Sequence, residues 1–386
     1  ITGKKETEGA FVKSVFKDSH GRVWVGTNLN GMYYYDGVGI LKNLTVDGSE
    51  NLTYISPSIM EDKRGNVWFC ANSDVYCYDY SRNKALSIRT LYKFSEKAAL
   101  PFSLTIDKFD NIWIGYSSGV MRVSLSDRSA RNQFISIGSL SDMVSSEQIS
   151  RMIYDPIHNI VWACTKDNGI TVISLDKKGD VLKTKRLVHS ENLNSLSSDH
   201  VWSIVLASDS SVWFGTDSGL NKCVIEGANL TVTPMKSLKN IGNVKIMSIV
   251  EDQSQNLWLG TSQALYSYNF KTQIEKRFTI ANGLYSSAVL EGMYIDKTGI
   301  LYVGTTNGLN ILNTLPQERC PYAAEVQLVD FKIEVDAIIE KGVKKDEAIL
   351  QVLRKLIKIS KPIRFDGNNY TDEWKAEAKK RGLDCE

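Results

Sequence analysis

The chain repeats one alternation of apolar and polar segments seven times. Each copy has an apolar-rich segment, a polar turn, a segment built on a large aromatic residue, a second turn and a third apolar segment. The central segments are residues 23–27, 67–71, 112–116, 161–165, 212–216, 257–261 and 301–305, with aromatic residues at positions 24, 68, 113, 162, 213, 258 and 302. A period in the forties with several strands per unit is typical of a β-propeller.

The first turn of each copy has its own sequence rule. An aspartate opens it in six copies, and the fifth copy has Ala207 there; the aspartates are Asp18, Asp62, Asp107, Asp155, Asp252 and Asp296. Its carboxylate can accept backbone N–H bonds two residues on, so it is expected to hold the turn. The turn ends on Gly21, Gly65, Asn111, Asn159, Ser211, Asn256 and Gly299. Six of these seven are Gly or Asn, which accept a positive φ most readily, so we predict that conformation there.

These elements predict an all-β fold, a single seven-bladed β-propeller of four-stranded antiparallel blades. Residues 40–44 and 274–278 are examples of the fourth strand. The repeated aromatic residue is expected to pack between blades, and the Gly that follows it in most copies to let a neighbouring strand approach closely. The seventh copy ends near Leu312 without a fourth strand. We hypothesise that residues 1–9 close this last blade.

Composition narrows the partners and the chemistry. The 386 residues carry a net charge of +2 with the charges well mixed, so no nucleic-acid partner is expected. No apolar run approaches the roughly 18 residues of a membrane segment. No signal peptide is visible, but the chain starts at Ile1, which makes that observation uninformative. No cofactor and no metal are expected, since the cysteines at 70, 77, 164, 223, 320 and 385 and the histidines at 20, 158, 189 and 200 lack ligand spacing. The histidines are interpreted as solvated turn residues.

Cys70 and Cys77 flank a predicted hairpin and are expected to face each other across two strands. Cross-strand neighbours have Cβ atoms about 4.5–5.5 Å apart, slightly long for a disulfide. A disulfide and two small packed residues both fit this pattern. Packing is favoured because Cys70 and Cys164 stand where most copies have glycine.

Residues 14–36 and 248–268, with the lead-in at 194–197, resemble the two-component regulator propeller repeat, and the resemblance covers residues 11–312. It implies the periplasmic sensor region of a hybrid two-component system of Bacteroidetes. Sensors of this family respond to oligosaccharides from complex glycans. The resemblance therefore implies an oligosaccharide ligand, a homodimer through the sensor region, and a signal passed to a downstream domain absent from this chain.

The expected domains follow from the repeats and from this family. Residues 1–313 form the propeller, 314–333 a linker with the first strand of a truncated β-sandwich, and 334–386 a short α-helical tail. Helices are predicted over 346–359, from an apolar stripe, and over 372–381, from a cap at Thr371 and a stop at Gly382. Residues 361–383 resemble a C-terminal segment of type III glutamine synthetases. The tail lacks the ammonia-, ATP- and metal-binding parts of that enzyme, so no activity is carried over.

Three functions compete for the propeller. The favoured one is a non-catalytic ligand sensor, and the alternatives are a protein-interaction scaffold and a glycan lyase or hydrolase. A glycosidase needs two carboxylates about 5–10 Å apart, and the repeated aspartates are turn formers. The non-repeated Asp142, Glu147 and Glu291 are not tied together by the sequence, so no catalytic residue is assigned. Ligand-binding residues remain unassigned, but the extra segments 138–148 and 188–199 are where specificity is expected.

Overall fold

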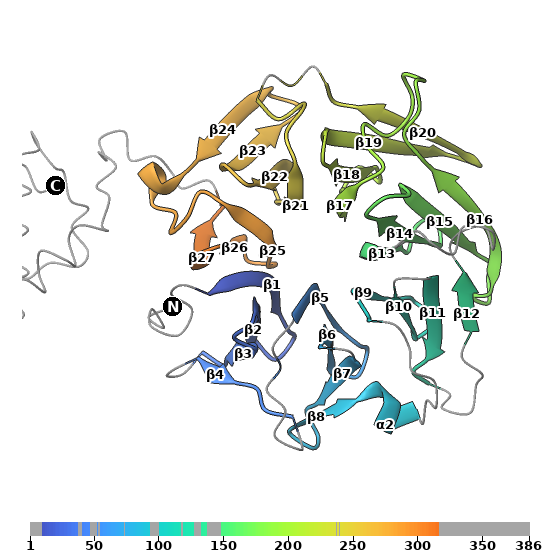
Figure 1. The fold of residues 1–386 in the computed structure, drawn as a ribbon, viewed down its shortest axis with the longest axis vertical. Helices are drawn as coiled ribbons and strands as arrows, with labels where there is room; N and C mark the ends of the chain where they lie inside the picture. Colours follow the sequence, from blue (N-terminus) through green and yellow to red (C-terminus); the bar gives the residue numbers. More distant parts are fainter. Residues whose placement is uncertain are drawn as a thin grey trace, which may run out of the picture. The chain divides into compact units, whose positions relative to one another are not determined.

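Seven antiparallel sheets surround one axis in the computed structural model of the chain (Figure 1). It describes residues 10–37, 41–46, 52, 55–72, 74–92, 100–116, 119–126, 133–136, 148–236, 238 and 240–315. The chain divides into two units, Ile1–Thr314 and Leu315–Glu386. The first is a seven-bladed propeller, so the predicted fold class is confirmed.

Each sheet is one blade, numbered here in chain order, and its first strand lies nearest the axis (Figure 1). Blades 1 to 3 are β1 (Phe11–Lys17), β2 (Val23–Asn28), β3 (Met32–Tyr35) and β4 (Lys42–Asn43); β5 (Ile55–Glu61), β6 (Val67–Ala71), β7 (Asp74–Asp79) and β8 (Lys84–Ser87), followed by the helix α2 (Ile88–Tyr92); β9 (Ser103–Ile106), β10 (Asn111–Gly115), β11 (Gly119–Ser124) and β12 (Gln133–Ser136). Blades 4 and 5 are β13 (Ile149–Asp155), β14 (Ile160–Thr165), β15 (Ile170–Leu175) and β16 (Val181–Leu187); β17 (Val201–Leu206), β18 (Val212–Thr216), β19 (Gly219–Glu226) and β20 (Asn229–Pro234). Blades 6 and 7 are β21 (Ile246–Glu251), β22 (Asn256–Thr261), β23 (Leu265–Asn269) and β24 (Ile274–Phe278), followed by the 3-10 turn η1 (Ile280–Asn282); β25 (Val289–Ile295), β26 (Ile300–Thr305) and β27 (Gly308–Asn313).

The ring closes between the first and last blades. The Gly308 N–H donates to the Ala10 carbonyl over 3.0 Å, and Lys17 Nζ lies 2.7 Å from Asp296 Oδ2. Within the described residues the seventh sheet has three strands. The fourth strand that we assigned to residues 1–9 lies outside the described residues, and so do the sandwich strand and the helical tail.

The turn before the central strand is held by its opening aspartate in the six blades that have one, as predicted. In blade 3, Asp107 Oδ1 accepts the backbone N–H groups of Phe109 and Asn111 over 2.8 and 2.9 Å. Its Oδ2 accepts the buried indole N–H of Trp113 over 2.7 Å. The same carboxylate–indole bond joins Asp18 to Trp24, Asp62 to Trp68 and Asp252 to Trp258, over 2.6, 2.9 and 2.8 Å. The aspartate thus links the turn to the packing aromatic, which the sequence analysis did not foresee.

The predicted place of the positive φ is wrong by one residue in three blades. The φ angles are 65° at Asp110, 65° at Ser210 and 60° at Gln255, each one position before the residue we named. A backbone hydrogen bond sets the length of the turn: the carbonyl of its first residue accepts from the N–H of the residue three positions later. In blades 3 and 6 the asparagine that follows uses its side chain to donate to the aspartate instead.

Blade 4 departs from this arrangement. Its turn is one residue longer, so Asp155 stands seven positions before Trp162 instead of six. Asp155 Oδ2 lies 2.7 Å from His158 Nδ1, and the Trp162 indole nitrogen is buried without a hydrogen-bond partner within the described ranges. One inserted residue therefore removes the carboxylate–indole bond.

This difference predicts unequal costs for two matched substitutions. Trp113→Phe removes a charge-assisted bond to Asp107, whereas Trp162→Phe removes an indole N–H that has no partner. Hydrogen bonds to charged groups contribute roughly 1.5–3 kcal/mol, so we expect Trp113→Phe to cost about that much more than Trp162→Phe. Urea unfolding of the two variants measures the difference. Equal losses of unfolding free energy would show that the indole bond adds nothing.

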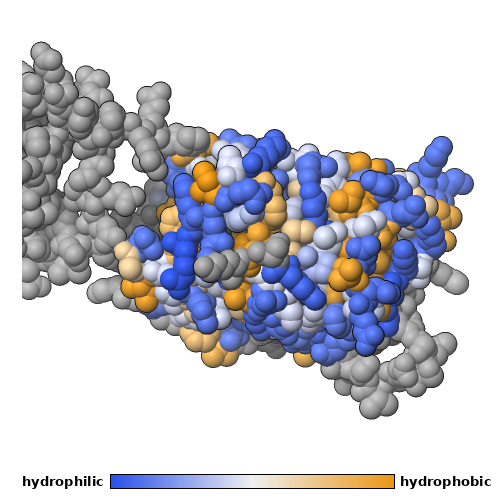
Figure 2. Space-filling model, turned by 90° about the horizontal axis from the view of Figure 1, so that it is seen from above, coloured by the Kyte–Doolittle hydropathy of each residue, from blue (hydrophilic) through white to orange (hydrophobic). Residues whose placement is uncertain are grey.

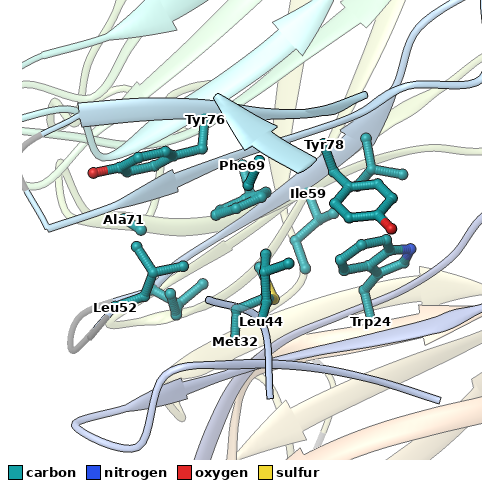
Figure 3. Packing of buried hydrophobic residues seen from close by; sticks show 12 residues of the cluster. Trp24, Met32, Leu44, Leu52, Ile59, Phe69, Ala71, Tyr76 and Tyr78 are labelled. Carbon is teal, nitrogen blue, oxygen red and sulfur yellow. The ribbon is translucent and has the colours of Figure 1, made fainter. Parts of the chain in front are cut away.

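Apolar side chains fill the spaces between neighbouring blades. Between blades 1 and 2, Trp24 and Tyr78 meet edge to face with ring centroids 5.1 Å apart, and Met32 and Phe69 lie beside them (Figure 3). All four are almost fully buried. The repeated tryptophan is thus a core residue in this blade pair, which agrees with the packing role predicted for it.

The glycine after the packing aromatic permits the close approach that we expected. A Cβ added to Gly260 would lie 2.6 Å from Val289 Cγ1 of the next blade, and one on Gly215 would lie 2.7 Å from Ile246 Cγ2. Real Cβ atoms do not approach other atoms so closely, so a side chain there would push the blades apart.

Cys70 and Cys77 do not face each other. Cys70 pairs with Val75 and Cys77 with Trp68, because the hairpin turns after Ala71 and is not centred between the two cysteines. They are diagonal neighbours, about 7–8 Å apart by general sheet geometry, which is beyond disulfide reach. Both are free and buried, as are Cys164 and Cys223, so the packing interpretation is confirmed for Cys70 and Cys77.

On the side of the propeller that Figure 2 shows, hydrophilic residues predominate and hydrophobic residues form separate groups. Within the described part of the chain, no helix is long and apolar enough to cross a membrane.

Candidate functional site

The inner strands carry the positions at which the seven copies differ. Register shifts interrupt the pairing of six inner strands with their neighbours, as between Val12 and Ser14 and between Val201 and Ser203. A bulge leaves a residue outside the ladder and re-aims its side chain. The residue skipped in the register is Lys13, Ser150, Trp202 or Met247 in four blades, and in blades 2 and 7 the skipped stretch is three residues long and includes Pro57 or Glu291. The next position is Ser14, Ser58, Ser103, Ser203 and Ser248 in five blades.

Arg151 of blade 4 replaces that repeated serine and crosses the centre of the ring. Its guanidinium donates to the carbonyl of Pro57 in blade 2 over 2.5 Å and to the carbonyl of Glu291 in blade 7 over 2.7 Å. Burial lowers the pKa of Arg151, and the nearby Glu291 opposes that shift. One side chain therefore ties together three blades that are far apart in sequence.

Glu291 lies beside Arg151 with part of its carboxylate unsatisfied. Its Oε1 is 3.6 Å from the ammonium of Lys13 in blade 1. Its Oε2 is buried and has no hydrogen-bond partner among the described residues, and the whole residue is only 9% exposed. A buried carboxylate oxygen without a hydrogen-bond donor destabilises the folded state. The centre of the ring is therefore a polar region in which Glu291 can accept one more hydrogen bond.

A second group of side chains gathers where blade 5 meets blade 6. The His200 ring stacks on Trp202 with centroids 4.4 Å apart, and Lys245 Nζ lies 3.4 Å from the centroid of the same indole. The Trp202 indole N–H donates to Asp217 Oδ1 over 2.8 Å. Because the imidazole and the ammonium cannot share one face at these distances, both faces of Trp202 are covered. A sugar could stack on this indole only by displacing Lys245.

The protonation of His200 follows from its neighbours. Its Nδ1 lies 3.2 Å from Asp217 Oδ2, and its Nε2 is buried without a partner in the described part of the chain. Burial lowers the pKa of His200. The charges of Lys245 and Lys166 lower this pKa further, and the carboxylate of Asp217 opposes the shift. The neutral ring is therefore favoured. Since a carboxylate only accepts, Nδ1 carries the hydrogen and Nε2 presents a lone pair.

Lys166 lies next to this group. It begins the second turn of blade 4, and that turn contacts the entry to β17, because the Gly169 N–H donates to the Asp199 carbonyl over 2.9 Å. Its ammonium forms no ion pair or hydrogen bond with any described residue. Burial lowers the pKa of Lys166, and the charges of Lys13 and Lys245 lower it further, whereas the carboxylates of Asp167 and Glu291 oppose that shift. We call Lys166, His200, Trp202, Asp217 and Lys245 the blade-5 cluster.

The predicted site segments have mixed outcomes. Segment 188–199 leads into the blade-5 cluster, and its own bonds hold it, such as that between His189 Nδ1 and the Leu196 carbonyl at 2.6 Å. Segment 138–148 lies outside the described residues except for Gln148, as do Asp142 and Glu147. Glu291 is brought to the centre of the ring.

The histidine interpretation holds for His20, whose side chain is 45% exposed, but it is wrong for His200. Sequence reasoning also missed Arg151, Trp202, Lys166 and Lys245. A sequence signal was available for Trp202, which stands at the variable position before the repeated serine, Ser203.

A separate hollow of about 750 Å³ lies between blades 2 and 3, lined by residues that include Asp62, Arg64 and Tyr92. Its central charges are already used, since Asp62 holds its turn and Arg64 lies 3.6 Å from Asp62 and 3.4 Å from Asp110. In the described ranges no group of three or more His, Cys, Asp or Glu side chains is placed to hold a metal. The blade-5 cluster and the centre of the ring are therefore the better candidates.

Comparison with known proteins gives two separate similarities. Residues 8–29 match the two-component regulator propeller family, and residues 348–386 match the glutamine synthetase C-terminal domain. Histidine kinase P4 of Formosa agariphila is 28% identical over 259 residues, covering 55% of this chain and 18% of that protein. Glutamine synthetase of Bacteroides fragilis is 53% identical over 57 residues, covering 15% of this chain and 8% of that enzyme. The chain thus spans only a small part of these curated relatives.

Two solved structures share the fold. The extracellular domain of the hybrid two-component system BT3049 from B. thetaiotaomicron has a TM-score of 0.60 at 22% identity, over 79% of this chain and 39% of that one. Virginiamycin B lyase from Staphylococcus aureus has a TM-score of 0.58 at 12% identity, over 80% of this chain and 94% of that one. The chain thus shares its propeller fold with the extracellular domain of a hybrid two-component system, and part of it is similar to a histidine kinase. Its first repeat matches the two-component regulator propeller family, and residues 348–386 match the glutamine synthetase C-terminal domain, so both predicted resemblances are confirmed.

Proposed function

We propose that this propeller is the non-catalytic, ligand-binding part of an extracytoplasmic sensor of the hybrid two-component type. It binds an oligosaccharide in the periplasm and passes the signal to a downstream domain of such a system. The observation that carries this proposal is the convergence of non-repeated polar side chains on one region of a rigid ring. Similarity to sensor propellers supports the direction from ligand to signal.

The arrangement suits binding better than turnover. Asp217 accepts from Trp202 and lies 3.2 Å from His200 Nδ1, and Glu291 lies 3.6 Å from Lys13. Asp217 is therefore engaged with two neighbouring groups, whereas Glu291 keeps one oxygen, Oε2, without a partner among the described residues. A rigid ring with pre-formed polar groups loses little entropy on binding, which favours recognition of a flexible sugar.

A thermal-shift screen of the full chain against plant and host oligosaccharides tests the proposal. A ligand at one hundred times its Kd adds about 2.7 kcal/mol of stability, so a clear rise in Tm is expected for at least one glycan. Chromatography of each mixture after incubation checks for products. Release of shortened or unsaturated sugars would favour a lyase or hydrolase, and a silent panel would favour a protein-interaction scaffold.

A further inference from the structure

We propose that the ligand of this propeller carries an anionic group, a carboxylate or a sulfate on a polyhydroxylated molecule, which Lys166 binds while His200 accepts a hydroxyl hydrogen. This inference rests on the proposed function, since it specifies the ligand class of the same site.

The first support is the position of Lys166. Lys166 and Asp217 are equivalent residues, because each follows the threonine that ends the central strand of its blade, Thr165 or Thr216. In blade 5, Asp217 lies 3.7 Å from Lys245 at the entry to blade 6. In blade 4 the same position is a lysine, and its neighbour at the entry to blade 5 is His200. Blade 4 therefore has the cation Lys166 at the position where blade 5 has Asp217, the anion of an ion pair with Lys245.

The second support is that the ammonium of Lys166 forms no ion pair within the described residues. Lys13 and Lys245 each lie within 4 Å of a carboxylate, whereas Lys166 makes no ion pair with any described residue. Burial and the nearby Lys13 and Lys245 disfavour the charged form of Lys166 more than Asp167 and Glu291 favour it, so a bound anion would stabilise that charge. An incoming carboxylate or sulfate would accept hydrogen bonds from Lys166 in a partly desolvated place, where charge-assisted bonds are strong.

The third support is the unpartnered ring nitrogen of His200. With the ring hydrogen on Nδ1, which lies 3.2 Å from Asp217 Oδ2, Nε2 is an acceptor that has no donor among the described residues. A hydroxyl group is the matching donor, because it gives one hydrogen and needs little space. An acidic saccharide, which bears both hydroxyl groups and an anionic group, satisfies His200 and Lys166 together.

The test is calorimetric titration of the full chain with matched pairs of sugars. One pair is a trimer of α-1,4-linked galacturonic acid and its methyl ester, which keeps the hydroxyl groups and removes the charge. The other pair is a sulfated galactose trimer and its sulfate-free form. We expect one acidic member to bind at least about tenfold more tightly than its neutral partner, and added salt to weaken that preference. The pair that shows the preference identifies carboxylate or sulfate as the anion.

Three variants assign the effect to the site. Lys166→Gln should abolish the preference for the acidic sugar, Lys166→Arg should retain it, and Lys183→Gln on the exposed strand β16 should change nothing. His200→Phe keeps an aromatic ring beside Trp202 and should weaken both members of a pair. Unchanged Tm values of the Lys166 variants without ligand confirm that they fold.

The outcomes separate the two proposals. Equal binding of acidic and neutral sugars, or an undiminished preference in Lys166→Gln, overturns the anion site and leaves the sensor function standing. If no sugar binds, the oligosaccharide sensor fails, and millimolar inorganic sulfate then probes the anion site alone. Stabilisation by sulfate that Lys166→Gln removes would keep the anion site, and its absence would overturn it.

Discussion

Replacing Asp107 by alanine is expected to lower the free energy of unfolding by about 3–5 kcal/mol. This buried carboxylate accepts hydrogen bonds from Phe109, Asn111 and Trp113. Alanine would leave two backbone donors and the indole N–H without an acceptor, and the turn would lose the group that closes it. Urea unfolding followed by circular dichroism measures the change.

Asp209→Ala is the matched control. Asp209 lies in the corresponding turn of blade 5, where it accepts from the Ser211 N–H and pairs with Lys222 at 2.9 Å. Its side chain is 50% exposed, and Trp213 has no hydrogen bond to it. Exposed ion pairs contribute little, so the loss should stay below about 1 kcal/mol. Similar losses in the two variants would contradict the role assigned to the carboxylate–indole bond.

The fold was predictable because local chemistry repeats. Seven aromatic anchors at a nearly constant spacing, with turn residues at fixed offsets, defined the blades and most of their strands. The strand β24 coincides with the residues predicted for it, Ile274–Phe278. The predicted strand at 40–44 is shorter, since β4 covers Lys42–Asn43. The predicted position of the positive φ was wrong by one residue, as at Asp110, because the hydrogen bond to the first residue of the turn sets its length.

The candidate site was less predictable because its contacts are long-range. Counting back from Trp162 places Met152 at the position of the repeated serine, since the extra residue in the turn shifts the register. The structure instead pairs Arg151 with Cys164, the residue at the glycine position. The two hydrogen bonds of the Arg151 guanidinium join residues that are 94 and 140 positions apart, and no local sequence pattern contains that information.

Trp202 illustrates the same limit. The sequence shows a tryptophan outside the repeated positions but does not indicate which residues cover its ring. The structure covers both of its faces with His200 and Lys245. The indole then acts as a support that positions a histidine and a lysine, and ligand specificity shifts from aromatic stacking to charge and hydrogen bonding.

The strongest test of the central network is Arg151→Met, which we expect to lower the free energy of unfolding by about 2–4 kcal/mol. Methionine keeps an unbranched side chain, although a shorter one, and removes the donors to the Pro57 and Glu291 carbonyls. It also removes the cation next to the Glu291 carboxylate, one oxygen of which has no partner among the described residues. Blades 2, 4 and 7 would lose their common tie.

Arg277→Met on the exposed strand β24 serves as the control and should be close to neutral. Taking a guanidinium out of water costs free energy. If the hydrogen bonds of a buried arginine only balance that cost, its replacement does not lower the free energy of unfolding. If Arg151→Met were as stable as the parent chain, the tie between blades would have no net energetic value. A loss of stability in Arg151→Met but not in Arg277→Met, with an unchanged m-value in urea unfolding, would instead show that Arg151 stabilises the ring. The arginine that replaces the repeated serine would then have a structural role of its own.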